Sequence, residues 1–400
     1  MMKDRLLLSM AVEATLLPQG NRRRIESNIK QIIMLETVKY LIGSAGTSGF
    51  GSKSTGEEVT AAAASRLRSI TAIVTGATSG IGAETARVLA MRGARLVLPA
   101  RNLKAAEETK MRIATEFPGA EIVVLPLDLS SFASVRCFVS RFLALRLPLN
   151  LLMYAFPRYF FIINSYALSR YSLLNRGSVS NRNNAGKFSH DYAVTEDGVE
   201  MTFATNYLGH FLLTKLLLNK MAETARETGI QGRIVNVTSA IHTWFSGDSL
   251  HYLDLITGQK VPYDGTRVYA LSKLANVLHA MELTLRLQQM EANVTANCVH
   301  PGIVRTGLTR DREGLVTDLA FSLMSKLLKT IPQAAATTCY VAAHPGLEGV
   351  SGKYYADCNE ASPSTSACSR EEATRMWLAS EVMTARFRLE ALPPSEEAEM

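Results

Sequence analysis

The chain alternates short apolar runs with longer segments in which apolar residues recur at helical spacing. The apolar runs lie at residues 69–74, 95–100, 120–127, 149–153, 233–237 and 293–299. Runs of this length bounded by turn residues are typical of buried strands, whereas segments such as 83–90, 103–116 and 129–139 indicate helices. Strands that alternate with helices form a parallel sheet covered on both faces. The sequence therefore predicts an α/β fold with a doubly wound parallel sheet in three αβα layers.

A glycine-rich loop directly follows the first predicted strand and precedes a predicted helix. Such a loop presents unpaired backbone N–H groups and the positive end of the helix dipole to a pyrophosphate. Glycines suit it because a Cβ would block the tight turn and the approach of the backbone to phosphate. Simple turn chemistry is the alternative for such a loop taken alone. The candidate cofactor-binding residues are Gly76, Thr78, Ser79, Gly80, Ile81 and Gly82.

A tyrosine and a lysine four residues apart lie in a segment with helical apolar periodicity. Tyr269 and Lys273 fall on one face of the helix that residues 271–278 indicate. An isolated pair of this kind is usually a solvated surface pair. Here, however, the strands at 233–237 and 293–299 end in polar or turn residues, at the edge where open parallel sheets bind ligands. The pair is therefore a candidate for catalysis.

At this point the chain resembles the short-chain dehydrogenase/reductase family, whose fold is of the Rossmann type. The matching motifs occur in the family's order and are Thr75 to Gly82, Asn183-Asn184-Ala185-Gly186, Asn206, Ser239, Tyr269 with Lys273, and Pro301-Gly302 followed by Thr306. The blocks 203–214, 233–239 and 272–276 look like the retinol-dehydrogenase-like branch, and within it like plant proteins associated with the chloroplast inner-envelope import machinery. The resemblance implies a catalytic domain at 69–357, preceded by an extension at 1–68 that is partly disordered or targeting, and followed by a tail at 358–400.

The resemblance also implies catalytic roles. A free tyrosine has a pKa of about 10 and needs a nearby positive charge to stabilise its phenolate. Tyr269 would be the general acid/base, with Lys273 and the nicotinamide cation supplying that charge, and Ser239 would hydrogen-bond the carbonyl oxygen. Asn206 would hold a water that relays protons, and a structural amide inside a helix is its alternative.

The cofactor is expected to be NADP(H). Arg101 follows the second predicted strand, where an acidic residue would bind the 2′-hydroxyl of NAD and an arginine suits a 2′-phosphate. Asp128 matches the family's adenine-side carboxylate; capping the helix at 129–139 is a compatible alternative. The other cofactor-binding residues that the resemblance implies are Asn102, Leu129, Asn184, Ala185, Gly186, Thr238, Pro301, Gly302, Val304 and Thr306, together with Tyr269 and Lys273.

Composition agrees with an ordinary globular enzyme. Hydrophobic residues make up 47% and charged residues 20% of 400 positions, which suffices for one catalytic domain plus extensions. The five cysteines show no C-x-x-C pairing and no histidines at metal-ligand spacing, so we expect a reduced compartment and no metal. No uninterrupted apolar run of about 18 residues exists, so we expect no spanning helix, whereas peripheral membrane contact stays open.

The net charge of +7 belongs to two segments outside the family pattern. Residues 1–33 carry six basic and three acidic groups, and residues 154–182 carry four arginines and no acid, which together account for the whole excess. Because the basic residues form no patch on the predicted fold, we expect no nucleic-acid binding. Residues 1–33 are partly amphipathic, but Asp4, Glu13 and Glu26 argue against an acid-poor transit peptide and leave a simple upstream extension as the alternative.

An atypical insert at about 154–182 separates the strand at 149–153 from the Asn-Ala-Gly turn. It is rich in Tyr, Phe, Ile, Leu and Ser, whose codons are rich in uridine, so we hypothesise a retained intron or a misplaced exon boundary. As translated protein it would form a flap of poor solubility beside the cofactor crevice, because looping out costs little but solvating aromatic residues costs more.

The substrate is predicted to be an apolar carbonyl or alcohol. One wall of its pocket is expected from Trp244, Phe245, Tyr252 and Tyr263, and a second wall, or a surface-lying amphipathic helix, from residues 315–331. A helix at 371–389 is expected either to pack on the domain or to bind a protein partner.

The family resemblance implies a peripheral location at the chloroplast inner envelope, with a cytoplasmic location as the alternative. A cofactor-sensing interaction protein of the import machinery, or a folded product inactivated by the insert, is the rival to the enzyme.

Overall fold

The computed structural model describes residues 31, 34–154, 191–304 and 328–385. At its centre is an eight-stranded sheet in the order β3-β2-β1-β4-β5-β6-β7-β8. Every neighbouring pair is parallel except β7 and β8. The strands are β1 (Thr71–Thr75), β2 (Arg95–Ala100), β3 (Ile122–Pro126), β4 (Leu151–Tyr154), β5 (Gly232–Val237), β6 (Val294–His300), β7 (Tyr354–Ala356) and β8 (Asn359–Ala361). The predicted doubly wound sheet is confirmed.

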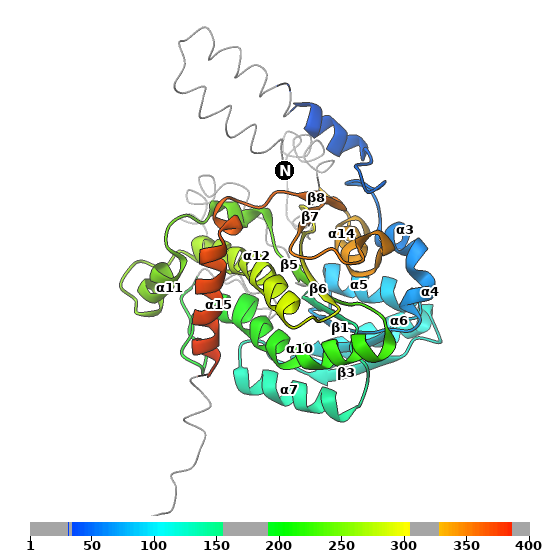
Figure 1. The fold of residues 1–400 in the computed structure, drawn as a ribbon, viewed down its shortest axis with the longest axis horizontal. Coiled ribbons are helices and arrows are strands. Elements are labelled where there is room, and N and C mark those ends of the chain that lie inside the picture. The colour runs from blue at the N-terminus through cyan, green and yellow to red at the C-terminus, as the bar shows by residue number, and fades with distance from the viewer. Residues whose placement is uncertain (1–30, 32–33, 155–190, 305–327, 386–400) are drawn as a thin grey trace, which may run out of the picture.

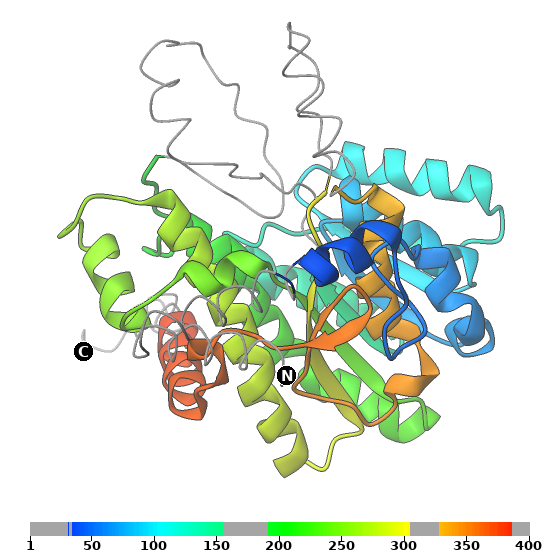
Figure 2. The same cartoon turned by 90° about the horizontal axis from the view of Figure 1, so that it is seen from above.

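Helices cover both faces of the sheet (Figures 1 and 2). One hydrophobic core lies between the sheet and α3 (Gly56–Thr60), η1 (Ala61–Ala63), α4 (Ala64–Leu67), α5 (Gly80–Met91), α6 (Leu103–Glu116) and α14 (Ile331–Ala343). The other lies under α7 (Phe132–Ala144), α9 (Met201–Phe203), η2 (Ala204–Leu208), α10 (Gly209–Thr228), α11 (Ser249–Thr257), α12 (Gly265–Gln289) and α15 (Arg370–Ala385). Short turns complete the chain at η3 (Ala240–Trp244), η4 (Pro345–Leu347) and η5 (Ser366–Cys368).

Local sequence explains where most elements begin. All residues of β1 and β5 are buried, as continuous apolar runs inside a parallel sheet require. The strand predicted at 95–100 and the helix predicted at 103–116 have the predicted bounds. The helix predicted from 129 begins instead at Phe132, because Ser131 caps it through the N–H of Ser134 at 3.2 Å. The cap predicted for Asp128 is therefore wrong.

Strand β4 extends one residue further than predicted. Tyr154 is fully buried and lies between Thr75 of β1 and Asn236 of β5 in the sheet register. The first residue of the insert predicted at about 154–182 therefore pairs in the sheet between two central strands. The rest of the predicted insert, and with it the splicing hypothesis, lies outside the described residues.

The carboxyl-terminal region holds elements that the hydrophobic pattern did not predict. Helix α14 begins with a capping box formed by Thr330 and Gln333. Ile331, the last residue of the predicted wall at 315–331, is the first residue of this helix, and 315–327 lie outside the described residues. Strands β7 and β8 form a hairpin whose turn residues Asp357 and Cys358 have φ values of 51° and 63°.

Helix α15 packs on the domain. This is one of the two alternatives predicted for the helix at 371–389, the other being a site for a protein partner. Trp377 is 4% exposed, and its ring lies 4.9 Å from that of Phe211 on α10. The guanidinium of Arg286 on α12 lies 4.4 Å from the same indole ring, in cation–π geometry. Within the described parts of the chain, no helix combines the length and apolar character needed to cross a membrane.

Candidate functional site

The glycine loop connects the carboxyl end of β1 to the start of α5. Gly76 and Gly80 have φ values of 64° and 59°, a left-handed conformation that glycine adopts without strain. Ser79 stands at the cap position of α5, so the first N–H groups of this helix face the end of the sheet. This geometry fits the pyrophosphate of a dinucleotide.

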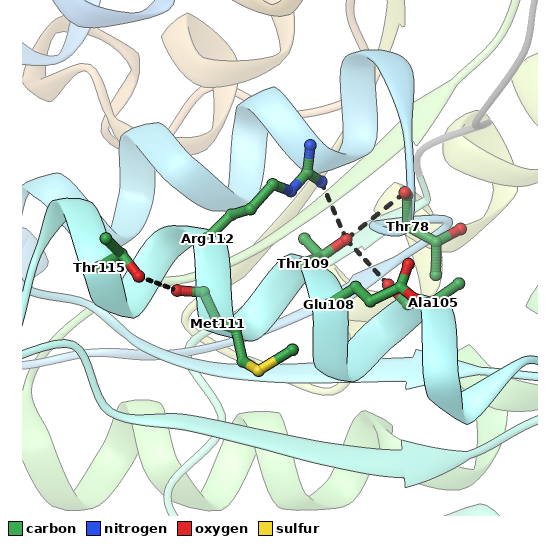
Figure 3. A pocket seen from close by; sticks show the side chains of 7 residues that line it. All are labelled: Thr78, Ala105, Glu108, Thr109, Met111, Arg112 and Thr115. Carbon is green, nitrogen blue, oxygen red and sulfur yellow. Dashed lines mark hydrogen bonds between the residues drawn. The ribbon is translucent and has the colours of Figure 1, made fainter.

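Helix α6 contacts the glycine loop through a hydrogen bond of one of its side chains. The hydroxyl of Thr109 donates to the backbone oxygen of Thr78 at 3.4 Å, and Arg112 Nη2 donates to Thr109 Oγ1 at 3.1 Å. Figure 3 shows these side chains lining an open pocket between the loop and α6. Sequence reasoning missed Thr109 and Arg112, because their helical segment carries no motif.

Tyr269 and Lys273 lie on the first turns of α12, which Asp264 caps through the N–H groups of Thr266 and Arg267. Lys273 Nζ lies 5.3 Å from the centre of the Tyr269 ring, and Lys273 is fully buried. Burial raises the pKa of Tyr269 above its ordinary value and lowers that of Lys273 well below its own. The phenol is therefore protonated at neutral pH, which is the form that donates a proton to a carbonyl oxygen.

Thr238 and Ser239 directly follow β5, and Thr238 connects α12 to the sheet by a hydrogen bond. Thr238 Oγ1 donates to the backbone oxygen of Lys273 at 2.8 Å, and Thr238 is fully buried. Ser239 caps η3, where its Oγ accepts the N–H of Ile241 at 3.4 Å. That contact uses a lone pair of the oxygen, so the hydroxyl hydrogen of Ser239 can be donated to a ligand.

Asn206 lies on the π-helical turn η2, a rare distortion that frequently occurs at functional sites. Its Nδ2 donates to Ser272 Oγ at 3.2 Å, and Ser272 Oγ in turn donates to the backbone oxygen of Tyr269 at 2.7 Å. The backbone oxygen of Asn206 accepts Asn276 Nδ2 at 3.1 Å. The structure thus joins Asn206 to the helix of the Tyr–Lys pair. Sequence reasoning missed Asn276, although its spacing of seven from Tyr269 is a signal for one helix face.

His210 is a second polar residue that sequence reasoning missed. Its Nε2 lies 3.1 Å from Thr75 Oγ1, directly before the glycine loop, and its Nδ1 lies 3.4 Å from the backbone oxygen of Asn206. Burial lowers the pKa of His210 to about 3, so the imidazole is neutral. It therefore links β1 to the π-helical turn without adding a charge.

Arg101, Asn102 and Asp128, which are expected on the adenine side of the cofactor, follow the carboxyl ends of β2 and β3. Arg101 Nη1 lies 3.6 Å from Asp128 Oδ2, and 44% of the Arg101 side chain is exposed, so this ion pair is weak. Asn102 caps α6 through the N–H of Ala105 at 3.1 Å. Asp128 Oδ1 accepts both the N–H and the hydroxyl of Ser130. Leu129 is a core residue, 4% exposed.

The turn after β6 holds three more of the predicted cofactor residues, Pro301, Gly302 and Val304. Gly302 has a φ of 85°, and Val304 is buried and forms a parallel bridge with Lys329. Pro301 is buried beside them. Four predicted cofactor residues lie outside the described residues, namely Asn184, Ala185, Gly186 and Thr306. The others stand at or near the carboxyl ends of β1, β2, β3, β5 and β6, or on α12.

The four aromatic residues predicted to form one wall of the substrate pocket lie in different environments. Phe245 and Tyr252 are core residues with ring centres 5.7 Å apart, and the guanidinium of Arg267 lies 4.0 Å from the centre of the Tyr252 ring. Trp244 is 62% exposed, whereas the Tyr263 hydroxyl donates to Glu200 at 2.9 Å. Hydrophobicity alone did not distinguish residues that fill the core from one that faces solvent.

The described residues contain no cluster of three or more His, Cys, Asp or Glu that could hold a metal ion. All five cysteines are free thiols, with Cys298, Cys339 and Cys358 buried and the other two exposed.

The doubly wound sheet, the glycine loop and the Tyr–Lys pair at its edge define a nicotinamide-cofactor oxidoreductase. Residues 70–155 match the sequence profile described as "short chain dehydrogenase". The chain is 44% identical over 343 residues to "Short-chain dehydrogenase TIC 32 B, chloroplastic" of Brassica napus, covering 86% of this chain and 97% of that protein. It is 37% identical over 328 residues to "Retinol dehydrogenase 14" of Homo sapiens, covering 78% and 85%.

Among solved structures, the fold is similar to a crystal structure of an uncharacterised protein from Mycobacterium paratuberculosis. The TM-score is 0.55 at 26% identity, covering 79% of this chain and 93% of that chain. The chain belongs to the short-chain dehydrogenase/reductase family of oxidoreductases. The predicted family, its retinol-dehydrogenase-like branch and its likeness to a plant chloroplast protein are thus confirmed.

Proposed function

We propose that this protein is an NADP(H)-dependent oxidoreductase that interconverts the carbonyl and alcohol forms of an apolar small molecule. The observation that best supports this proposal is the fully buried Lys273 side chain, whose Nζ lies 5.3 Å from the centre of the Tyr269 ring. Burying a lysine is costly, so its place beside a phenol at the cofactor edge supports a role in chemistry.

In this proposal Tyr269 and Lys273 would lie beside the nicotinamide ring of the bound cofactor, which would supply the hydride for the substrate carbon. Tyr269 donates its proton to the carbonyl oxygen, and Ser239 donates a hydrogen bond to the same oxygen as negative charge develops there. When the phenolate forms, the charged state of Lys273 becomes favourable, because opposite charges attract strongly in a poorly solvated site. Asn206 orders this arrangement through Ser272, and holds the water that returns a proton to the pair.

Binding of NADP(H) rather than NAD(H) rests on Arg101. Its side chain is partly exposed after β2, and its contact with Asp128 at 3.6 Å is long enough for a 2′-phosphate to compete for the guanidinium. The glycine loop, Thr238 and the turn at 301–306 complete the proposed cofactor site, together with the Asn-Ala-Gly turn at 184–186.

We further propose that residues 69–357 form the catalytic unit, with an extension at 1–68 and a tail at 358–400. The extension contributes to the fold at its carboxyl end, because Val59 and Leu67 are buried in the core beneath α14 and α5.

The proposed substrate is an apolar carbonyl or alcohol, and the proposed location is the chloroplast, on the periphery of the inner envelope. Support for the substrate class comes from the relatives named as retinol dehydrogenases, and support for the location comes from the relatives named as chloroplastic. An association of this chain with the protein import machinery is part of the same proposal.

The test is the Tyr269→Phe variant, assayed with NADPH and a panel of retinoid-like aldehydes, steroid ketones and pigment-derived carbonyls. We expect turnover to fall by about 10²- to 10⁴-fold, because the proton donor is lost, while NADPH binding by fluorescence titration is kept. The control is Tyr192→Phe, which removes a hydroxyl bound to the backbone oxygen of Thr257 and should leave turnover unchanged. An undiminished rate in Tyr269→Phe would refute the catalytic proposal.

A further inference from the structure

An ion pair connects Lys329, two residues before α14, to the β7–β8 turn, with the lysine buried and 33% of the Asp357 side chain exposed. Lys329 is 1% exposed, and its Nζ lies 2.6 Å from Asp357 Oδ1. An ammonium is rarely buried unless a carboxylate compensates for its lost hydration. Neither residue belongs to the sequence motifs of the family, so the pair needs a separate explanation.

Lys329 contacts the turn that follows β6 in two ways. Its backbone N–H donates to the oxygen of Ile303 at 2.7 Å, and its backbone pairs with that of Val304. Its side chain runs against Gly302, since a Cβ built on Gly302 would lie 2.7 Å from Lys329 Cδ and 3.3 Å from Nζ. A side chain at position 302 would therefore collide with the buried lysine. Lys329 therefore stabilises the backbone of the turn through its backbone hydrogen bond, and its side chain fills the space beside Gly302.

Asp357 is itself held in place from several sides. The next residue, Cys358, donates its N–H to Thr337 Oγ1 of α14 at 3.2 Å. The Asn359 side chain accepts the N–H of Ser48 and donates to the oxygen of Phe50, both at 3.0 Å. Because the hairpin is fastened to α14 and to the amino-terminal segment, the carboxylate of Asp357 is a fixed anchor for Lys329.

A second ion pair on the same hairpin lacks these contacts. Lys353 Nζ lies 2.9 Å from Glu360 Oε1, but the two side chains are 43% and 45% exposed. An exposed pair of this kind contributes little to stability. It is a matched control, since it joins β7 and its neighbour β8 without touching the turn after β6.

We infer that Lys329 and Asp357 are positioning residues for the nicotinamide half of the cofactor site. The pair fixes the turn at 301–304, which lies at the carboxyl end of β6, where an open parallel sheet binds its ligand. In the proposed cofactor site the adenosine half lies along β1, β2 and β3, which are on the other side of β4 from β6 in the sheet order. Loss of the pair should therefore weaken binding of the nicotinamide half alone. This inference rests on the proposed NADP(H) function.

The test compares two ligands on the full chain by isothermal titration calorimetry. NADPH occupies both halves of the site, whereas adenosine 2′,5′-bisphosphate occupies only the adenosine half. In Asp357→Asn the pairing charge is lost but the residue still suits a φ of 51°. We expect about tenfold weaker NADPH binding, the order typical of a misplaced contact, and bisphosphate binding within about twofold of the unchanged protein. Glu360→Gln should bind both ligands normally.

Two results would overturn the inference: equal NADPH binding by Asp357→Asn and Glu360→Gln, or an equal loss for both ligands in Asp357→Asn. An equal loss for both ligands would mean that the ion pair only stabilises the fold. Lys329→Met, which keeps the aliphatic contact with Gly302, should reproduce the selective loss, and normal NADPH binding by this variant would also count against the inference. If the unchanged chain binds neither ligand, the proposed function fails first, and the inference falls with it.

Discussion

Asn276 Nδ2 lies 3.1 Å from the backbone oxygen of Asn206, and 2.9 Å from that of Ser272. A single amide group thus joins the π-helical turn to the helix that carries Tyr269 and Lys273. Asn206 and Ser272, which carry these two backbone oxygens, are both fully buried, so water is no substitute partner for either oxygen. The hydrogen bond between Asn276 and Asn206 fixes how the helix that carries Tyr269 and Lys273 packs against the turn that carries Asn206.

Replacing Asn276 by Ala should therefore lower both turnover and stability, and should leave cofactor affinity less affected. We expect kcat to fall by about 10-fold or more, and the free energy of unfolding to fall by about 1–3 kcal/mol, because buried acceptors lose their donor. Steady-state kinetics, NADPH titration and urea unfolding measure the three quantities separately.

The control for this variant is Asn297→Ala. Asn297 is also buried, and its side chain bonds the backbone of Val350 and Lys353 rather than that of α12. We expect a similar loss of stability with kcat retained. Equal losses of kcat in both variants would show that Asn276 acts only through stability.

Arg101→Gln should reduce the preference for NADPH. Without the guanidinium, the 2′-phosphate loses a charged partner, so we expect the Kd for NADPH to rise about 10- to 100-fold while that for NADH changes little. Fluorescence titration with both cofactors measures this selectivity.

Arg112→Gln serves as the comparison for Arg101→Gln. Arg112 lies in the pocket beside the glycine loop and bonds Thr109, so it tests whether any nearby positive charge suffices (Figure 3). If Arg112→Gln loses NADPH affinity and Arg101→Gln does not, the 2′-phosphate is bound by Arg112 rather than by Arg101.

Stability should fall as the pH decreases from about 6.5 toward 4. Burial lowers the pKa of His210 and His279 to about 3 and that of His300 to about 4, whereas an unfolded histidine titrates near 6.5. Between these values the unfolded chain binds more protons than the folded one, so the free energy of unfolding decreases as the pH falls. Urea unfolding at pH 7.5, 6 and 5 measures this slope.

His279→Gln should flatten that dependence, because it removes one of the histidines whose pKa burial lowers, although it costs stability at pH 7.5. The imidazole of His279 packs between Phe211 and Trp377, so part of this cost is lost contact. His251→Gln, on the exposed side of α11, should leave the slope unchanged. An unaltered slope in His279→Gln would mean that other groups carry the acid sensitivity.

The sequence alone determined the central architecture and the local motifs. Strand β2 and helix α6 have the predicted bounds because their apolar spacing and the cap at Asn102 are local properties. The spacing of four between Tyr269 and Lys273 likewise placed both groups on one helix face. The glycines of the loop after β1 were identifiable because a tight turn requires φ values that other residues avoid.

Only the tertiary structure decided which distant residues share a contact. Asn276 and Asn206 are 70 positions apart, and Lys329 and Asp357 lie on either side of α14, so no local pattern pairs them. The structure also separated the buried Phe245 from the exposed Trp244, its neighbour in the sequence. The physical reason is the same in each case: hydrogen bonding, ion pairing and burial depend on which surfaces meet when helices pack on the sheet, and that is a property of the whole chain rather than of any segment.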